Sequence, residues 1–286
     1  MLEVMQRLTS KKISAQEALV PIHPGVEFWH CSILDDQSFP ISGGFAATRD
    51  YARKIAIAEF LERMNYHKIY RNPDQHKVWG LDSVSTACGF AVGFHRENTI
   101  LRSIAEAHER WVMSKWIDED YLIEEIPAEV VEKDLDPVSK FFASHFDKVL
   151  YFKKDLAVPI EDKWVTLEIA QTMGLKDNGI YPGSSAQKTG GNLWQHSLLE
   201  SFRHYLAVKN NPDRGDVFPD NKVHFFSKNS QVALDQIYRP KKEQWPVSQI
   251  KFHRCEQIDD GNYFLARTIV DGWNTWNQGL LERFLY

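Results

Sequence analysis

The chain has 286 residues, and its shares of hydrophobic (43%) and charged (26%) residues are those of a globular protein with a substantial core. A formal net charge of −5 disfavours a general nucleic-acid binder, which would need a basic face. The three cysteines are too widely spaced for a zinc framework or a disulfide scaffold and fit a reducing compartment. With neither a signal-peptide pattern nor an apolar run of membrane-spanning length, the sequence predicts a cytoplasmic protein without nucleic-acid or membrane partners.

The first part of the chain predicts a short helix, a strand and a long helix. Residues 14–19 suit a short capped helix, and the aromatic-rich residues 26–34 suit a strand. The small residues at 40–47 predict a loop. Thr48 is then a good N-cap for a mostly buried helix over 51–66, where apolar residues recur with helical spacing.

The middle of the chain repeats the order of a small-residue loop and a long helix. Residues 67–94 predict an extended segment that ends in a second loop of small residues, and a second long helix is expected from Asn98 to about Trp116. After an acidic stretch, Asp136 and Pro137 predict the start of another helix.

The last part of the chain contains a third loop–helix pair and several strands. In chain order we expect strands at 148–152 and 164–170, a small-residue loop at 179–191, a helix capped by Asn192 and running to about 208, and strands at 247–253 and 263–270. This order predicts one α/β or α+β domain over residues 1–286, with three loop–helix repeats packed on a mixed β-sheet.

The first two long helices contain the same sequence, Ile-Ala-Glu-x-x-Glu-Arg. It occupies residues 57–63 and again residues 104–110, and a weaker third copy lies at 196–203. Glutamates three residues apart lie on one face of a helix, where their carboxylates repel each other unless a cation lies between them. The two copies therefore give four candidate Mg²⁺ ligands and catalytic carboxylates, Glu59, Glu62, Glu106 and Glu109.

Simpler explanations compete with metal binding. Either copy alone is better explained as a solvated helix face, because Glu and Arg are strong helix formers. Two copies, each behind a small-residue loop, make the two explanations about equal. In the metal-binding alternative the loops contact phosphates through backbone N–H groups, although none has a P-loop sequence. Arg267, inside an apolar strand, either faces water or contacts a phosphate. The histidines show no metal-ligand spacing.

Taken in order, these segments resemble the YcaO family of ATP-dependent enzymes, which activate backbone amides of peptides. The resemblance rests on four segments. Three are glycine-containing stretches followed by a helix with glutamates: Gly43 and Gly44 before the helix ending at Arg63, residues 89–93 before the helix ending at Arg110, and Gly183 before the helix with Glu200. The fourth is the strand 265–272 around Arg267. They span roughly residues 40–275. Ile55, Phe94 and Asn98 replace a serine, an asparagine and a glutamate of the family pattern.

The resemblance implies a fold, cofactors and an activity. ATP and Mg²⁺ would bind, with the metal on the four glutamates and the nucleotide near Arg63, Arg110, Arg267, Gly44, Gly89 and Gly93. The enzyme would O-phosphorylate a backbone amide of a precursor peptide in RiPP biosynthesis, as a cyclodehydratase forming azolines does, or in thioamide or amidine formation. A separate E1-like or TfuA-like protein would present the peptide, and homodimers are common in the family.

Two other classes of function stay open. One is a non-catalytic YcaO-like subunit that scaffolds a peptide-modification complex, which Ile55, Phe94 and Asn98 favour. The other is an ATP-dependent enzyme that cleaves or modifies a different bond.

Overall fold

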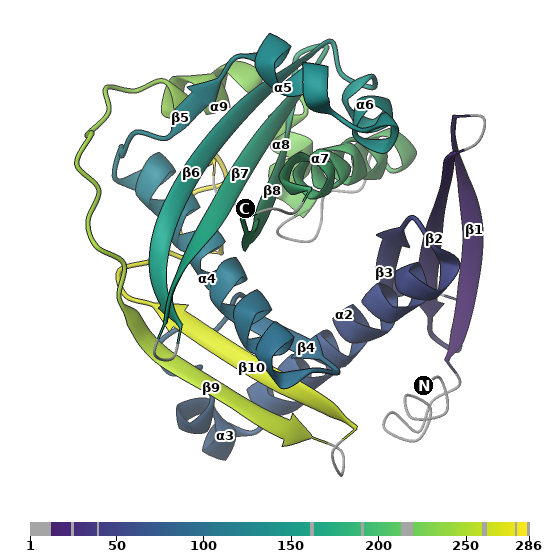
Figure 1. Ribbon diagram of the computed structural model, residues 1–286, viewed down its shortest axis with the longest axis vertical. Coiled ribbons are helices and arrows are strands. Elements are labelled where there is room, and N and C mark those ends of the chain that lie inside the picture. Colours follow the sequence, from purple (N-terminus) through teal and green to yellow (C-terminus); the bar gives the residue numbers. More distant parts are fainter. Residues whose placement is uncertain are drawn as a thin grey trace. The chain divides into compact units, whose positions relative to one another are not determined.

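The protein is described by a computed structural model covering residues 13–23, 26–38, 40–160, 163–189, 192–212, 220–258, 262–277 and 279–284. Within these ranges it has three antiparallel sheets with helices packed against them (Figure 1). The expectation of one mixed sheet is therefore wrong. The chain divides into two compact units: unit 1 is Met1–Ser103 with Phe252–Thr268, and unit 2 is Ile104–Lys251 with Ile269–Tyr286. The single domain over 1–286 stays a prediction.

The first sheet of unit 1 contains strands β1 (Ser14–His23), β2 (Val26–Leu34) and β3 (Pro40–Ala46), in that order. The expected helix at 14–19 is wrong, because those residues pair with β2 in a register that sets Ser14 opposite Leu34. Tertiary pairing here overrides a weak local helix preference. Strand β2 confirms the prediction for residues 26–34.

Helix α2 (Arg49–Tyr70) covers this sheet. Its start is as predicted: the Thr48 hydroxyl accepts a hydrogen bond from the backbone N–H of Tyr51 at 3.3 Å. The helix continues past residue 66, and α3 (Pro73–Val78) follows where an extended segment was expected. The side chain of Asn72 caps α3 by accepting from the N–H of Asp74, a local signal that the apolar pattern does not reveal.

The second sheet has the order β4 (Phe90–Gly93), β10 (Tyr263–Val270), β9 (Ile250–Ile258). The core of unit 1 joins it to α2, with Ile57, Leu61, Trp79 and Phe90 all nearly inaccessible to solvent. The predicted strand at 263–270 is confirmed, and the one predicted at 247–253 begins three residues later as β9. Helix α4 (Arg96–Asp118) confirms the second long helix.

Unit 2 is built on a four-stranded sheet with the order β5-β6-β7-β8. Its strands are β5 (Glu124–Ile126), β6 (Lys148–Ile160), β7 (Lys163–Lys176) and β8 (Gly179–Lys188), and its further helices are α5 (Ala128–Asp134), α6 (Pro137–Ala143), α7 (Leu193–Asn210), α8 (Asp220–Phe226) and α9 (Ser230–Ile237). The predicted caps of α6 and α7 are both present: Asp136 accepts from the N–H of Val138 at 2.8 Å, and Asn192 accepts from that of Gln195 at 3.3 Å.

The three small-residue segments expected as loops are largely strands. They form β3, β4 and β8, each at an edge of its sheet and each followed by a long helix. Their small residues allow close packing on that helix. A Cβ atom on Gly44 would lie 2.2 Å from the carbonyl oxygen of Ala52, and one on Gly183 would lie 1.9 Å from that of Ser197. Small residues here mark strands that a helix backbone approaches closely.

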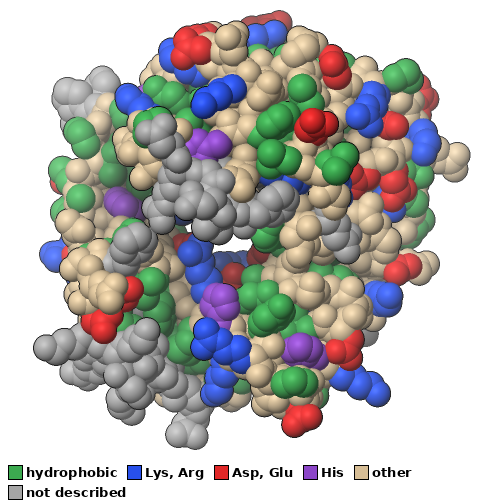
Figure 2. Space-filling view, turned by 180° about the vertical axis from the view of Figure 1, so that it is seen from behind, with side chains coloured by type: hydrophobic (Ala, Val, Ile, Leu, Met, Phe, Trp, Pro, Cys, Tyr) green, Lys and Arg blue, Asp and Glu red, His purple; other side chains and the backbone are tan. Residues whose placement is uncertain are grey.

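The charge pattern of the surface is mixed. Figure 2 shows acidic and basic side chains interspersed with apolar ones over the face that it draws. No helix in the described ranges is both long and apolar enough to span a bilayer.

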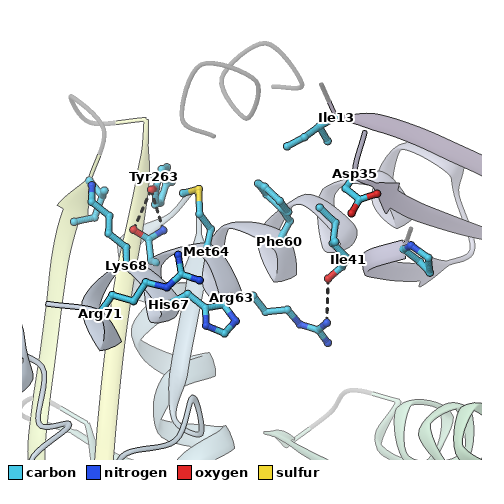
Figure 3. Close-up of a pocket in the computed structure, with 13 residues that line it drawn as sticks. Ile13, Asp35, Ile41, Phe60, Arg63, Met64, His67, Lys68, Arg71 and Tyr263 are labelled. Atoms are coloured by element: carbon cyan, nitrogen blue, oxygen red, sulfur yellow. Dashed lines mark hydrogen bonds between the residues drawn. The ribbon is translucent and has the colours of Figure 1, made fainter. Parts of the chain in front are cut away.

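Unit 1 also contains a cavity of about 910 Å³ beside α2 (Figure 3). Phe60 and Met64 line it from the helix, Ile41 lines it from β3, and Tyr263 lines it from β10. The cavity therefore lies between elements that are far apart in the sequence.

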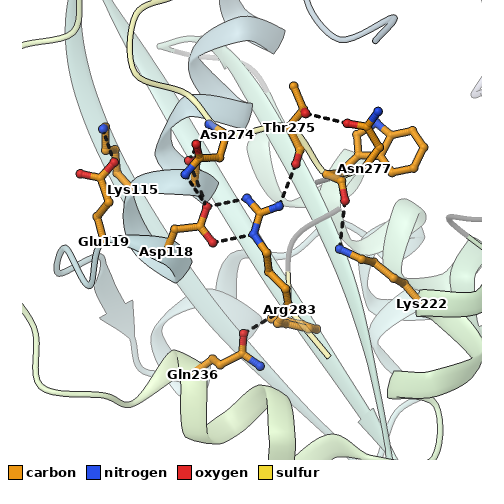
Figure 4. Close-up of polar contacts among 12 residues, drawn as sticks. Lys115, Asp118, Glu119, Lys222, Gln236, Asn274, Thr275, Asn277 and Arg283 are labelled. Atoms are coloured by element: carbon orange, nitrogen blue, oxygen red, sulfur yellow. Dashed lines mark hydrogen bonds and ion pairs between the residues drawn. The ribbon is translucent and has the colours of Figure 1, made fainter. Parts of the chain in front are cut away.

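A partly buried ion pair fixes the C-terminal segment of unit 2 to α4 (Figure 4). Arg283 donates from Nε at 2.7 Å and from Nη2 at 2.5 Å to the Asp118 carboxylate, which also accepts from Asn274. Burial acts to raise the pKa of Asp118, but these hydrogen bonds outweigh it and lower the pKa. Nearby, the buried Lys222 donates to the carbonyl of Trp276, and burial lowers its pKa to about 8.

The close approach at Gly44 predicts a position-specific loss of stability. In Gly44→Ala the added methyl group meets backbone atoms of α2, which can yield only if the helix moves, so we expect a loss of about 3 kcal/mol in the free energy of unfolding. Gly43→Ala is the matched control, because its Cβ would lie 3.4 Å from the nearest atom, on His30. Urea denaturation measures both, and equal stability losses for the two variants would contradict the packing argument.

Candidate functional site

The structure assigns the predicted glutamates to two helices. Glu59 and Glu62 lie on α2 in unit 1, and Glu106 and Glu109 lie on α4 in unit 2. Glu109 is buried, with 7% of its surface exposed, and the other three are partly buried. None of the four is fully solvated, so the simple alternative of an exposed helix face does not describe them.

Glu59 ties α2 to the edge of the first sheet. Its Oε2 accepts from the backbone N–H of Gly43 at 3.0 Å, and its Oε1 accepts from Arg63 at 2.5 Å. Arg63 also donates to the carbonyl of Ile41 in the same strand at 3.0 Å. This carboxylate therefore satisfies an N–H group that the edge strand β3 cannot pair within its sheet.

A cluster of buried and partly buried polar groups in unit 2 is built from Glu109, Glu200 and Ser184. The Ser184 hydroxyl lies 2.7 Å from Glu109 Oε1 and 3.0 Å from Glu200 Oε2. The backbone N–H of Ser184 also donates to Glu200 Oε2 at 2.6 Å. A hydroxyl group has one proton to donate, so it satisfies only one of the two carboxylates at a time.

The electrostatics of this pair favour a cation or a shared proton. Burial raises the pKa of Glu109, and the charge of Glu200 raises it further, while Arg110 opposes both. Arg110 Nη2 lies 3.4 Å from Glu109 Oε1. Burial also acts to raise the pKa of Glu200, but Arg110 and His204 lower it more. The two carboxylates thus titrate as a pair, in which Glu109 holds a proton more readily than Glu200.

Gln171 adds a polar side chain beside this pair. It lies opposite Ser184 in the β7–β8 register, so the two side chains are on the same face of the sheet. Gln171 is fully buried, and within the described part of the chain neither its amide nitrogen nor its amide oxygen has a hydrogen-bond partner. An unpaired buried amide is costly, so this one is available to a ligand or an ordered water.

The sequence prediction missed Glu200 and Ser184 as site residues. The available signal was the weaker third copy of the repeat at 196–203. The edge N–H of Ser184 is accepted by the glutamate sixteen residues later, and the edge N–H of Gly43 is accepted by Glu59 at the same separation. Glu200 is therefore the equivalent of Glu59 in a repeated strand–helix unit.

Arg267 joins strand β10 to the loop that precedes β4. Arg267 is fully buried, which excludes the alternative of a solvent-facing side chain. It donates to the carbonyls of Thr86 at 3.0 Å and Val84 at 2.6 Å, and lies 4.3 Å from the ring centre of Phe90. Its contact with a phosphate stays a prediction.

The glycines before α4 serve close packing. Gly89 has a φ of +78°, a conformation that favours glycine, and its carbonyl accepts from the Ser103 hydroxyl at 2.7 Å. A Cβ atom on Gly93 would lie 2.4 Å from Thr99 Oγ1 at the start of α4. Like Gly44, Gly93 lets a helix approach a strand, whereas Gly89 meets a backbone requirement, and the contact of both with a nucleotide stays a prediction.

Comparison with known proteins gives a match in structure. No protein-family model matches the chain, and no curated protein matches its sequence. The structure of YcaO from Methanopyrus kandleri bound with AMPPCP and Mg²⁺ matches with a TM-score of 0.59 at 11% sequence identity, over 95% of this chain and 88% of that one. This chain has a YcaO-like fold. A heterocyclase in complex with substrate and cofactor matches with a TM-score of 0.55 at 10% identity, over 98% of this chain and 53% of that one.

The structure shows the surroundings of the three residues that differ from the family sequence pattern. Ile55 and Phe94 pack against the hydrophobic core of unit 1, and Asn98 is exposed in the first turns of α4. The two apolar replacements therefore contribute to packing, which a serine or an asparagine would do less well.

The carboxylate pair predicts opposite effects of two isosteric substitutions. Because the pKa of Glu109 is raised on folding, its ionisation destabilises the fold as pH rises, and Glu109→Gln should be more stable than wild type near pH 8. The pKa of Glu200 is lowered, so its stabilisation is present at pH 8 and lost in acid, and Glu200→Gln should be less stable at pH 8. Urea denaturation with a chelator tests this, and shifts of equal sign would contradict the assignment.

The buried guanidinium of Arg267 predicts that lysine cannot replace it. A single ammonium group does not reproduce the fork that reaches the carbonyls of Val84 and Thr86, so Arg267→Lys should lose about 2 kcal/mol of unfolding free energy. Arg102→Lys is the comparison, since Arg102 is exposed and makes one bond, to the carbonyl of Val92. Thermal denaturation should show a clear loss only for the first variant.

Proposed function

We propose that this chain is an ATP- and Mg²⁺-dependent enzyme that O-phosphorylates a backbone amide of a precursor peptide. The observation that carries the proposal is the similarity of its fold, over 95% of its length, to a YcaO structure bound with AMPPCP and Mg²⁺. AMPPCP stands in for ATP. The heterocyclase match, a protein in complex with substrate and cofactor, supports a peptide-modifying reaction in the same way.

The residues of unit 2 fit a magnesium–nucleotide complex. Mg²⁺ bound with a nucleotide usually takes one or two protein carboxylates, with phosphate oxygens and water completing six ligands. Glu109 and Glu200 offer such a pair, and the Ser184 hydroxyl and the Gln171 amide offer further oxygen atoms. Within the described ranges no three histidine, cysteine, aspartate or glutamate side chains gather as a metal site made by protein alone would require. This smaller donor set suits a metal that shares its coordination with a nucleotide.

In the proposed reaction the chain supplies charge and position. Mg–ATP, when bound, would supply the phosphoryl group for the amide oxygen, with ADP as the leaving group. Glu109 and Glu200 would hold the metal, and Arg110 would balance negative charge beside them. Glu59, Glu62 and Glu106 are proposed as further ligands, and Arg63 and Arg267 as further nucleotide contacts.

In this proposal the identity of the nucleophile determines which product forms. A cysteine, serine or threonine side chain of the peptide would give an azoline, sulfide would give a thioamide, and an amine would give an amidine. A separate E1-like or TfuA-like protein is proposed to present the peptide, and two copies of this chain are proposed to associate.

A non-catalytic scaffold subunit is the second candidate. The observation that favours it is the packing of Ile55 and Phe94 into the core at positions where the family pattern has polar residues. The scaffold and the enzyme differ in one measurable property, because only the enzyme requires Mg²⁺-dependent binding of ATP.

Calorimetric titration with ATP, with and without Mg²⁺, tests the enzyme. We expect Mg²⁺-dependent binding that is weakened at least tenfold by Glu59→Gln with Glu106→Gln, and as strongly by Glu200→Gln, because each removes a charged ligand. Glu97→Gln is the control, since Glu97 is exposed at the start of α4. Absence of ATP binding by the wild-type chain would favour the scaffold, and equal binding by all variants would refute the carboxylate site.

A further inference from the structure

The cavity of unit 1 is lined on one side by cationic side chains from a single helix. Arg63, His67, Lys68 and Arg71 follow one another over the last turns of α2 and its C-cap, and all four line the cavity of about 910 Å³ (Figure 3). Asp35 is the one carboxylate among the described residues that line it. The wall formed by α2 therefore carries a clear excess of positive charge.

Two of these cations are available to a ligand. Arg63 already pairs with Glu59, whereas neither Lys68 nor Arg71 has a side-chain hydrogen bond or ion pair within the described part of the chain. Partial burial and the neighbouring Arg71 and Arg63 lower the pKa of His67. At neutral pH the positive charge of the cavity therefore comes from the lysine and the arginines.

Basic residues near a helix C-terminus have a simpler role, because they interact favourably with the helix dipole. That role explains why α2 ends in such residues, but it does not require them to border a cavity. Apart from Asp35, Asn65 and Tyr263, the rest of the lining is apolar, with Ile13, Ile41, Phe60, Met64 and Ile258 around the same space. Apolar walls beside unpaired cations are the chemistry of a binding site for an amphipathic anion.

We propose that this cavity binds an acidic segment of a peptide, whose carboxylates pair with Lys68 and Arg71 and whose apolar side chains pack on Phe60 and Met64. The inference rests on the proposed function in one respect, namely that the substrate is a peptide. It adds the part of the chain that would hold this peptide. Methionine adapts its shape to different apolar partners, which suits a site that accepts a peptide segment.

The geometry favours a peptide over a compact phosphate anion. The cavity is far larger than inorganic phosphate, and its cations lie at the C-terminal end of α2, where the partial negative charge of the helix opposes a compact dianion. Carboxylates spread along a peptide can reach the ends of the lysine and arginine side chains without approaching the helix terminus. Peptide carboxylates are thus the better match.

Fluorescence anisotropy with the full chain, and without nucleotide, tests the proposal. The probe is a labelled short peptide of alternating glutamate and leucine, compared with peptides of equal length in which glutamine or lysine replaces glutamate. We expect the acidic peptide to bind best, and charge reversal by Lys68→Glu with Arg71→Glu to weaken it about tenfold. Met64→Trp, which reduces the volume of the cavity without changing its charge, should also weaken binding. Lys54→Glu is the matched control, since Lys54 is exposed on the same helix and does not line the cavity.

The outcomes separate this inference from the proposed function. Equal binding of the acidic and glutamine peptides, or unchanged affinity in the charge-reversal variant, would overturn it. The inference would also be overturned if ATP or inorganic phosphate displaced the peptide from the wild-type chain and this competition disappeared in the charge-reversal variant. That result would assign the cavity to a phosphate group. Charge-dependent peptide binding by a chain that binds no ATP would leave the inference standing while the proposed function fails.

Discussion

The structure depends on hydrogen bonds between the exposed edge of a sheet and a glutamate on the helix that follows. An edge strand presents N–H groups that its own sheet cannot pair, and these groups need an acceptor when a helix covers them. Glu59 accepts from Gly43, and Glu200 accepts from Ser184, each across sixteen residues. The helix can approach closely enough only because Gly44 and Gly183 lack side chains. The two features occur together, which is why the small residues and the glutamates recur as one pattern.

Hydrophobic periodicity and capping residues were sufficient to predict the long helices and most strands. Thr48, Asp136 and Asn192 act as the caps that the sequence indicates. The three segments that were predicted as loops and form strands share one cause. Small residues are usual in loops, and nothing local distinguishes a loop from a strand whose glycine faces a helix backbone. Likewise, the sequence around Arg267 is the same apolar strand whether its side chain faces water or is buried. Only its hydrogen bonds to the loop carbonyls of Val84 and Thr86 show that it is buried.

The candidate site shows the same division between local and tertiary information. Glu109 was identified from the spacing of two glutamates, whereas the residues that surround it come from β7, β8 and α7. Its raised pKa arises from burial and from the nearby Glu200, and no property of its own helix predicts that. Two acids competing for one hydroxyl, next to an arginine and an unpaired amide, form a polar cluster that a divalent cation would complete.

Glu59 has a structural role that does not depend on a metal. Its carboxylate joins α2 to β3 whether or not a metal is bound, so a chain without catalytic activity would still need it for its fold. Glu200 is constrained in the same way through the N–H of Ser184. Retention of these glutamates in a divergent sequence is therefore evidence for the fold. Evidence for catalysis has to come from groups without a role in the strand–helix contact, such as the amide of Gln171.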